Sequence, residues 1–202
     1  MSNKNKNLDR RIQRTRQSLR EALIALIKEK GFDAITIQDL TDKANLNRAT
    51  FYLHYRDKYD LLEQSIDEVI EEMSAIITPS ENYVRSADPS EPYPGLVALF
   101  EHVAENADFF RTMMGSKGIP GFGTRMIHAL KGAFQQALDN VKKQGHQLQV
   151  PEEIILSYTT SAYLGVIYWW LENDLPYTPK FMASQLALIS SGQRRDETKD
   201  AK

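Results

Sequence analysis

Side chains able to bind nucleic acid are concentrated in the short segment 48–54, whose sequence is RATFYLH. Phe51 and Tyr55 are four residues apart, so on a helix they share one face and can pack inward. The remaining side chains then point outward and include a guanidinium, a hydroxyl, a phenol and an imidazole. Such groups hydrogen-bond base edges and phosphates in a major groove, so we expect this face to bind duplex DNA. The outward set is Arg48, Ala49, Thr50, Tyr52 and His54.

Two short helices joined by a tight turn are predicted to hold this segment. Thr36 followed by Asp39 resembles a capping box and predicts the start of the first helix. Asn45 can adopt the left-handed backbone that a tight turn needs. Asn47 is a good N-cap for a second helix that runs from Arg48 to about Tyr55. The range 36–55 therefore predicts a helix-turn-helix.

The charge of the chain is unevenly distributed. Residues 1–60 carry 13 lysines and arginines against 8 acidic residues, a net +5, whereas the rest of the chain carries a net −7. This asymmetry favours a polyanion as the partner of the N-terminal part, although a solvated charged surface has the same composition. A basic N-terminal arm could add nonspecific attraction to DNA or reach the minor groove. Its cations are Lys4, Lys6, Arg10, Arg11, Arg14 and Arg16.

The spacing of apolar residues predicts an all-α protein, because it is helical throughout and no strand alternation occurs. Asp57 is expected to cap a long helix to about residue 77, and prolines and glycine at 78–95 indicate a loop or linker. Further helices are expected at about 96–105, 107–114, 124–144, 152–173 and 179–190. The expected organisation is a flexible basic arm (1–9), a DNA-binding domain (10–72), a C-terminal helical domain (73–190) and a disordered tail (191–202).

Enzymatic chemistry finds little support in the sequence. The chain has no cysteine, which excludes disulfides, thiolate metal sites and cysteine nucleophiles. His54, His102, His128 and His146 share no metal-ligand spacing, and the glycines at 115–123 follow no strand. We therefore expect no catalysis, cofactor or metal. No apolar run approaching about 18 residues and no signal peptide is evident, so a cytoplasmic, nucleoid-associated protein without membrane contact is expected.

The stretch ITIQDLTDKANLNRATFYLHYRDKYDLL resembles the N-terminal domain of the TetR/AcrR-type bacterial transcriptional regulators. The shared motif is an Ile/Thr-rich start, a recognition segment ending in T-F-Y-x-H-Y, and D-K at the start of the fourth helix. The resemblance is specific over about residues 10–72. Asn45 stands where the family often has glycine and Asn47 where serine is common, and both substitutes suit the same backbone roles. The resemblance implies a homeodomain-like three-helix domain, followed by a C-terminal helical bundle for dimerisation and possible ligand binding.

The resemblance also implies roles for individual residues. The outward side chains of 48–54 would face the groove, and Tyr52, His54 and Lys58 match positions that commonly contact phosphates. Thr36 could reach a phosphate and Gln38 a base. The complete set of expected DNA-binding residues is Thr36, Gln38, Asn47, Arg48, Ala49, Thr50, Tyr52, His54, Tyr55 and Lys58.

The C-terminal helices offer candidates for a dimer interface and an effector pocket. Small residues beside aromatics on 152–173, together with the last helix, predict the interface, and intramolecular core is the alternative. Its candidates are Ala162, Gly165, Val166, Trp169, Met182, Leu186 and Ile189. Aromatic and methionine side chains could line a pocket with two polar groups, although such stripes are more often core. The pocket candidates are Phe100, His102, Phe110, Met113, Met126, Phe134 and Tyr158.

Together these features predict a homodimeric repressor of a palindromic operator, released by a small apolar or aromatic effector. A regulator controlled by a partner protein, or by no small molecule, is the first alternative. A helical protein-interaction bundle that does not bind DNA is the second. Salt-dependent binding to duplex DNA separates this bundle from both regulators.

Overall fold

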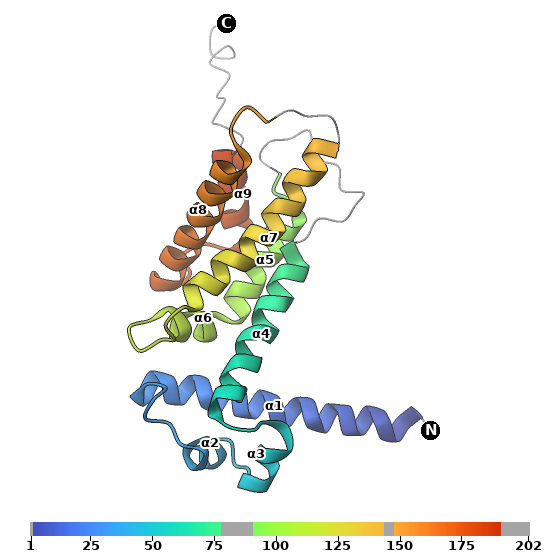
Figure 1. Cartoon of the computed structure of the whole chain (residues 1–202), viewed down its shortest axis with the longest axis vertical. Coiled ribbons are helices and arrows are strands. Elements are labelled where there is room, and N and C mark those ends of the chain that lie inside the picture. Colours follow the sequence, from blue (N-terminus) through green and yellow to red (C-terminus); the bar gives the residue numbers. More distant parts are fainter. Residues whose placement is uncertain (1, 78–90, 144–147, 191–202) are drawn as a thin grey trace, which may run out of the picture. The chain divides into compact units, whose positions relative to one another are not determined.

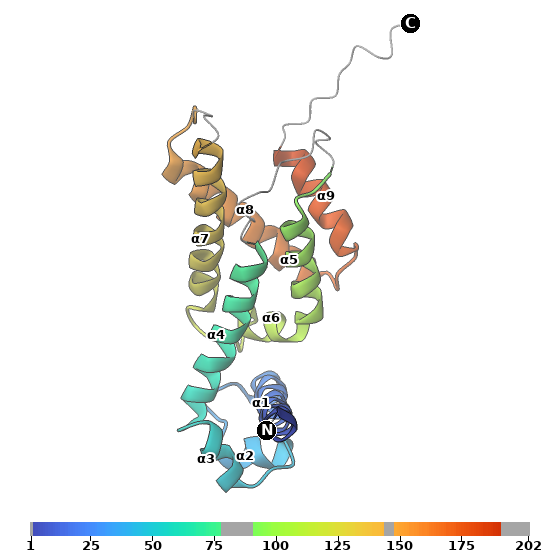
Figure 2. The ribbon, with the colours of Figure 1, turned by 90° about the vertical axis from the view of Figure 1, so that its right-hand side faces the viewer.

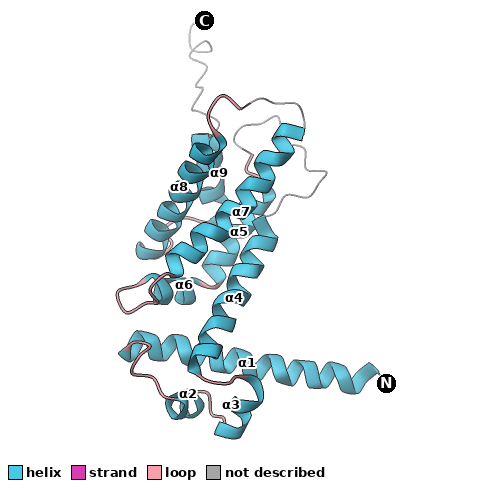
Figure 3. Cartoon of the chain, viewed as in Figure 1, coloured by secondary structure: helices cyan, strands magenta, loops and turns pink. Residues whose placement is uncertain are grey.

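The computed structural model describes residues 2–77, 91–143 and 148–190, and within these ranges every regular element is an α-helix (Figures 1 and 3). The all-α prediction is therefore confirmed, and most boundaries lie within two residues of those expected. The helices are α1 (Ser2–Lys30), α2 (Ile37–Lys43), α3 (Arg48–His54), α4 (Lys58–Ile77), α5 (Pro94–Glu105), α6 (Ala107–Met114), α7 (Phe122–Lys143), α8 (Glu152–Glu172) and α9 (Pro179–Ser190).

The chain divides into two compact units. The first, called the head here, consists of residues 1–71 and 108–125, and the second, called the body, consists of 72–107 and 126–202. The sequence placed the boundary near residue 72 but assigned 108–125 to the C-terminal domain. Helix α4 contributes residues to both units, since it runs from Lys58 to Ile77.

The core of the head forms where α1 packs on α2, α3 and α4. Leu19, Leu23 and Ile27 of α1 are fully buried, as are Leu40 of α2 and Phe51 of α3. Gly31 ends α1 with a φ of 77°, and its N–H bonds to the carbonyl of Ile27 at 2.9 Å. This is the left-handed helix end that the glycine predicts. Figure 2 looks nearly along α1 and shows α2 and α3 on one side of it.

Three polar connections explain why residues 108–125 belong to the head. Lys28 of α1 pairs with Asp108 at 2.8 Å, and the Lys117 ammonium donates to the Glu29 carbonyl at 3.0 Å. Arg125 bridges two carboxylates of α4, those of Glu63 (2.7 Å) and Asp67. These contacts join residues 58 to 88 positions apart in the sequence, so helical periodicity alone gives no sign of them.

The body is organised around the fully buried Trp170 of α8. Its ring meets Phe100 of α5 edge to face at 5.2 Å, and its indole N–H donates to the Tyr177 carbonyl at 3.0 Å. Phe134 of α7 meets Tyr163 of α8 at 4.9 Å, and α5 packs against α9. Aromatic contacts therefore connect three helices of this unit through α8.

The N-terminal end of the chain is helical. Helix α1 begins at Ser2, so residues 2–9 of the expected flexible arm are helical in the structure. The physical reason is that no glycine or proline interrupts the stretch 2–30, so a helix nucleated by the packed part of α1 can propagate backwards. The expected disordered tail (191–202) and most of the expected loop (78–90) lie outside the described residues.

Helix α8 also departs from the expectation that no segment resembles a membrane span. It has 21 residues, a mean hydropathy of 1.2 over its most apolar window, and 33% of that window is buried. One such helix among the described residues is weak evidence for a membrane span, because a core helix passes the same test. The exposed apolar part of α8 nevertheless needs an explanation.

Candidate nucleic-acid interface

Helix α2 starts with the capping box that the sequence predicts. The Thr36 hydroxyl accepts from the Asp39 N–H at 3.2 Å, and the Asp39 carboxylate accepts from the Thr36 N–H at 2.8 Å. Lys30 pairs with the same carboxylate at 2.7 Å. These partners, Lys30 first, lower the pKa of Asp39, which is ionised at neutral pH. Thr36 is exposed, but its hydroxyl is engaged in this cap.

The turn between α2 and α3 is set by two asparagines. Asn45 has a φ of 53°, the left-handed conformation that asparagine tolerates better than most residues. The Asn47 side chain accepts from the Thr50 N–H at 2.7 Å and from the Thr50 hydroxyl at 2.9 Å. Asn47 and Thr50 thus fix the start of α3, and both are committed to this cap in the structure.

One face of α3 packs into the head. Phe51 is fully buried and Tyr55, directly after the helix, is 3% exposed, with 5.8 Å between the ring centroids. The Arg16 guanidinium lies over the Tyr55 ring, 5.7 Å from its centroid. The inclusion of Tyr55 among the DNA-binding residues is therefore wrong, because four-residue spacing places it with Phe51 in the core.

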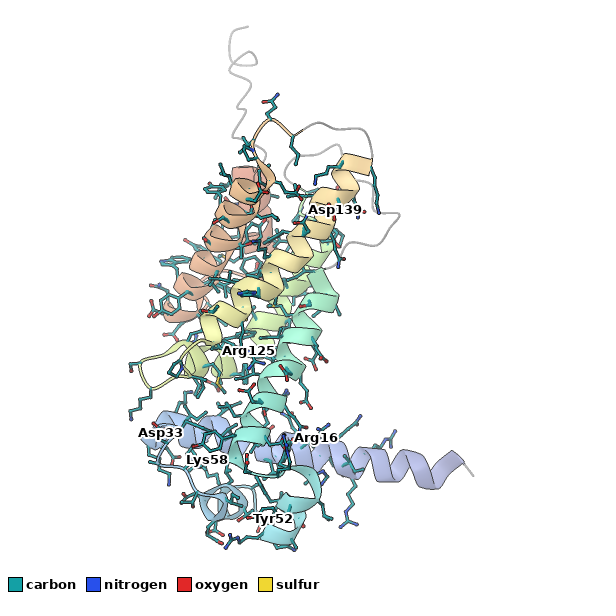
Figure 4. All side chains as sticks on the ribbon, in the orientation of Figure 1. Arg16, Asp33, Tyr52, Lys58, Arg125 and Asp139 are labelled. Carbon is teal, nitrogen blue, oxygen red and sulfur yellow. The ribbon has the colours of Figure 1, made fainter. Side chains whose placement is uncertain are left out.

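The opposite face of α3 is open to solvent. Arg48 and Ala49 are exposed, Tyr52 is 51% exposed, and Thr50 and His54 are half-buried. Figure 4 shows the labelled Tyr52 at the end of the head that carries α2 and α3. On α2, Gln38 is exposed and its amide donates to Asp42 at 2.6 Å. This face presents a cation, a phenol and an amide within two adjacent short helices, as a surface for DNA requires.

The surroundings of His54 favour its neutral form. Its partial burial, and then the nearby charge of Arg16, lower its pKa from the ordinary value of 6.5. A neutral imidazole can still donate one hydrogen bond, so a phosphate contact by His54 would be a hydrogen bond without an ion pair.

Lys58 occupies a different place from the one expected. Its ammonium donates to the carbonyls of Phe32 (3.2 Å), Asp33 (2.9 Å) and Ile35 (2.9 Å). It also lies 4.9 Å from the centroid of the Phe32 ring and 5.4 Å from that of Tyr59. An ammonium has three protons, and here each has an acceptor. In the structure these bonds therefore tie α4 to the α1–α2 loop (Figure 4).

The N-terminus of α4 is also occupied. The Asp57 carboxylate accepts from the N–H groups of Tyr59 (2.9 Å) and Asp60 (2.8 Å), which confirms Asp57 as the predicted cap. An anion seldom binds where a carboxylate already caps the helix. The neighbouring Arg56 has an 87% exposed side chain and pairs with Asp60 at 3.3 Å, so it remains accessible to a phosphate.

The basic residues of α1 fall into two groups. Arg16 hydrogen-bonds Gln64 and pairs with Glu68 at 3.4 Å, so it joins α1 to α4 rather than projecting as part of an arm. Arg10, Arg11 and Arg14 are exposed. In Figure 1 the N-terminal part of α1 extends beyond α2 and α3. A helix about 10 Å wide does not itself enter a minor groove about 6 Å wide, so only the side chains of α1 could reach into one.

The sequence reasoning missed one residue of the exposed face, Leu53. Its side chain is 82% exposed, the highest value among the large exposed hydrophobic residues that the structure describes. The same helical spacing that buries Phe51 places the residue two positions later on the opposite side, so the signal was present in the sequence.

The expected pocket residues are distributed over both units. Phe110 and Met113 belong to the head, where Phe110 packs near Phe122 at 6.3 Å. Phe100 and Met126 are fully buried in the body, and Phe134 packs on Tyr163. His102 is 6% exposed, with Nδ1 3.9 Å from a Glu72 carboxylate oxygen, whereas Tyr158 is 70% exposed and lines an open hollow along α8 with Ile154 and Ala162.

The expected dimer residues also separate into two groups. Met182 and Leu186 are 5% and 6% exposed and pack inside the body, so their assignment to an interface is wrong. Trp169 (46%) and Ile189 (58%) are exposed, as is Gly165, and Ala162 and Val166 are half-buried. The structure adds five exposed apolar or aromatic side chains on or between α8 and α9, namely Ile154, Tyr158, Tyr168, Tyr177 and Phe181.

Two family models match the chain. "Bacterial regulatory proteins, tetR family" covers residues 19–64, and "Transcriptional regulator C-terminal region", the TetR C-terminal model, covers residues 90–192. The first range contains the helix-turn-helix with its caps and packing face. The second contains every described helix from α5 to α9.

Known proteins agree with both models. The uncharacterized HTH-type transcriptional regulator YxbF of Bacillus subtilis is 26% identical over 187 residues, which is 90% of this chain and 46% of YxbF. IcaR, a negative transcriptional regulator of a biofilm operon in Staphylococcus aureus, is 32% identical over 59 residues, 29% of this chain and 32% of IcaR. The chain thus spans less than half the length of these relatives. The solved structure of FadR from Bacillus halodurans shares the fold, with a TM-score of 0.65, 18% identity and coverage of 90% and 96% of the two chains.

Proposed function

Because this chain belongs to the TetR family of bacterial regulatory proteins, a family of helix-turn-helix transcriptional regulators, we propose that it acts as a homodimer that reads a near-palindromic operator through α3. The observation that carries the proposal is the division of α3 into two faces. Phe51 fixes the helix to the head, while Arg48, Ala49 and Tyr52 are left exposed. No packing role inside the described head accounts for these exposed groups.

Each exposed group suits a particular contact. Arg48 carries a planar guanidinium that can bind the O6 and N7 atoms of a guanine in a bidentate manner. Tyr52 and His54 are suited to hydrogen bonds with phosphates, and Gln38 can release Asp42 to reach a base. Lys58 holds the α1–α2 loop and so positions the helix-turn-helix rather than touching DNA.

A second copy of the chain is the proposed cover for the exposed apolar face of α8 and α9. Ile154, Tyr158 and Trp169 lie at helical spacing along α8, with the small residues Ala162 and Gly165 between them. Small residues allow two helices to approach closely, and aromatic residues anchor interfaces. To enter successive major grooves, the two recognition helices of this dimer must lie about 34 Å apart, one helical turn of DNA.

The oligomeric state tests this part with a matched pair of variants. A Cβ added at Gly165 meets no atom within 4 Å, and the same holds for Gly132 on α7. Gly165→Glu should therefore leave the protomer folded but place a charge in the interface, and Gly132→Glu should be harmless. We expect sedimentation equilibrium to give a monomer for the first variant and a dimer for the second. A dimer for both variants would refute the proposed interface.

A small apolar or aromatic effector is the proposed regulator of DNA binding. Helix α4 has residues in both units, so an effector bound in the body could change DNA affinity through this helix. The effector must bind one state more tightly than the other to shift the equilibrium. Repression relieved by the effector is the proposed sign, and the protein would act on the chromosome in the cytoplasm.

Selection of duplexes from a random library by the full chain tests DNA recognition. We expect a near-palindromic sequence to be enriched, and Tyr52→Ala to abolish binding to it while the dimer persists. Unchanged binding of the Tyr52 variant would remove the role given to this residue. A panel of hydrophobic ligands then separates the effector model from a regulator controlled by a partner protein, because only a true effector raises the unfolding temperature.

A further inference from the structure

The centre of the exposed face of α3 is apolar. Successive residues of a helix are rotated by about 100°, so Leu53 lies about 200° around the axis from the buried Phe51. Ala49, one turn before Leu53, lies on the same side. Arg48 and Tyr52 lie together on one side of this pair, and Thr50 and His54 on the other, all closer to the packed face. The two side chains that point most directly out of the head are therefore an alanine and a leucine, both exposed.

A leucine that is 82% exposed at this position calls for a specific partner. Isolated exposed leucines are common on protein surfaces, but this one is the sixth residue of a seven-residue helix and lies opposite its buried face, with polar groups on either side of that line. In the major groove of DNA the thymine 5-methyl group is the apolar feature that bases present, and aliphatic side chains contact it. Ala49 has no long side chain to hold the helix away from the bases.

Charge favours duplex DNA over a protein as the occupant of this surface. The first 60 residues carry a net +5, and Arg48 stands on the same exposed helix. A protein-binding surface of this size is usually depleted of charge at its centre and extends over a larger apolar area. Here the apolar centre consists of two side chains, which matches one or two methyl groups in a groove about 12 Å wide.

We propose that Leu53 reads a thymine in each half-site through contact with its 5-methyl group, with Ala49 providing the close approach. This inference rests on the proposed function and specifies the base that the operator must contain. Contact with one methyl group removes roughly one CH₂ equivalent of apolar surface from water, which corresponds to about four-fold in affinity.

Replacement of individual thymines by deoxyuridine tests the contact, since this change removes only the methyl group. The operator obtained by selection is synthesised with one thymine replaced at a time, symmetrically in both half-sites, and binding to the full chain is measured by fluorescence anisotropy. We expect the affinity of the wild-type chain to fall roughly four-fold per half-site when the thymine at one position is replaced. Leu53→Ala should bind the original operator more weakly and show no further loss at that position.

Two variants serve as controls. Ile12→Ala removes another exposed aliphatic side chain of the head, outside α3, and should behave as wild type. Arg48→Ala should weaken operator binding but keep full sensitivity to the deoxyuridine replacement, because it leaves the methyl contact in place. Two results would overturn the inference. One is wild-type affinity that does not change when any thymine is replaced by deoxyuridine. The other is a loss of affinity on replacement that remains the same in Leu53→Ala. Failure to select any operator would overturn the proposed function as well.

Discussion

Replacement of Lys58 by methionine distinguishes a structural role from a DNA contact. Methionine keeps an unbranched stem of similar length beside Phe32 and Tyr59, but it removes the ammonium group. In the structure this group donates to three backbone carbonyls at 2.9 to 3.2 Å. We therefore expect the variant to weaken the connection between α4 and the α1–α2 loop.

The size of the effect follows from these contacts. A hydrogen bond from a charged group contributes roughly 1.5–3 kcal/mol when its partner is buried. Of the three acceptor residues, Phe32 and Ile35 are buried but Asp33 is exposed, and water can reach at least part of this loop once the ammonium is gone. We expect a net destabilisation of about 2 kcal/mol, equivalent to about a thirty-fold increase in the opening equilibrium of the head.

Amide hydrogen exchange is the appropriate measurement. Both tryptophans, Trp169 and Trp170, lie in α8, so tryptophan fluorescence reports on the body. Exchange of peptides covering α1 to α3 reports on the head, and it should accelerate about thirty-fold in Lys58→Met. Arg48→Met is the matched control, because it removes an exposed cation and should change stability by less than about 0.5 kcal/mol.

The salt dependence of DNA binding tests the alternative, in which Lys58 contacts a phosphate. Loss of a phosphate contact lowers the slope of log K against log salt by about one and leaves exchange unchanged. If Lys58→Met gave this pattern, the structural role of Lys58 would be refuted, and the lysine would bind phosphate as the family resemblance implies. We expect instead that amide exchange in α1 to α3 accelerates in Lys58→Met.

Two further predictions concern the head. Phe51→Ala should destabilise it by roughly 3–5 kcal/mol, because a fully buried ring is lost, and circular dichroism should show loss of part of the helix signal at a lower temperature than in wild type. Hydrogen bonds from the Arg56 N–H, Gln64 and the Arg56 side chain lower the pKa of Asp60 from 3.8 to about 2. A lowered pKa stabilises the folded state above about pH 4, and this contribution is lost as the pH falls towards 2. The unfolding temperature of wild type should thus decrease more steeply over this range than that of Asp60→Asn, and parallel decreases would contradict the assignment.

The helix-turn-helix was predictable because its signals are local. Thr36, Asn45, Asn47 and Asp57 each act on backbone groups within a few residues, so their roles can be recognised from residue type and spacing. The burial of Phe51 followed from four-residue spacing in the same way. The exposure of Leu53 also follows from this spacing, but the prediction considered only the polar side chains of the outward face and left this apolar residue out.

The remaining features depend on contacts between distant parts of the chain. The carbonyls that bind Lys58 belong to residues 23 to 26 positions earlier, so the sequence showed a lysine at a helix start without its acceptors. Met182 and Leu186 share the apolar spacing of α9 with Ile189, yet they are buried and Ile189 is exposed. Periodicity shows that a helix has an apolar face but does not show which part of the protein, or which partner, covers it.

The central claim is that the exposed face of α3 binds duplex DNA of a particular sequence. The most direct test is the affinity of the full chain for a selected duplex and for a scrambled duplex, measured between about 50 and 200 mM salt. We predict that log K falls linearly with log salt for both duplexes and that the selected duplex binds at least about a thousand-fold more tightly. Equal affinity for the two duplexes, or affinity that does not change with salt, would contradict the account.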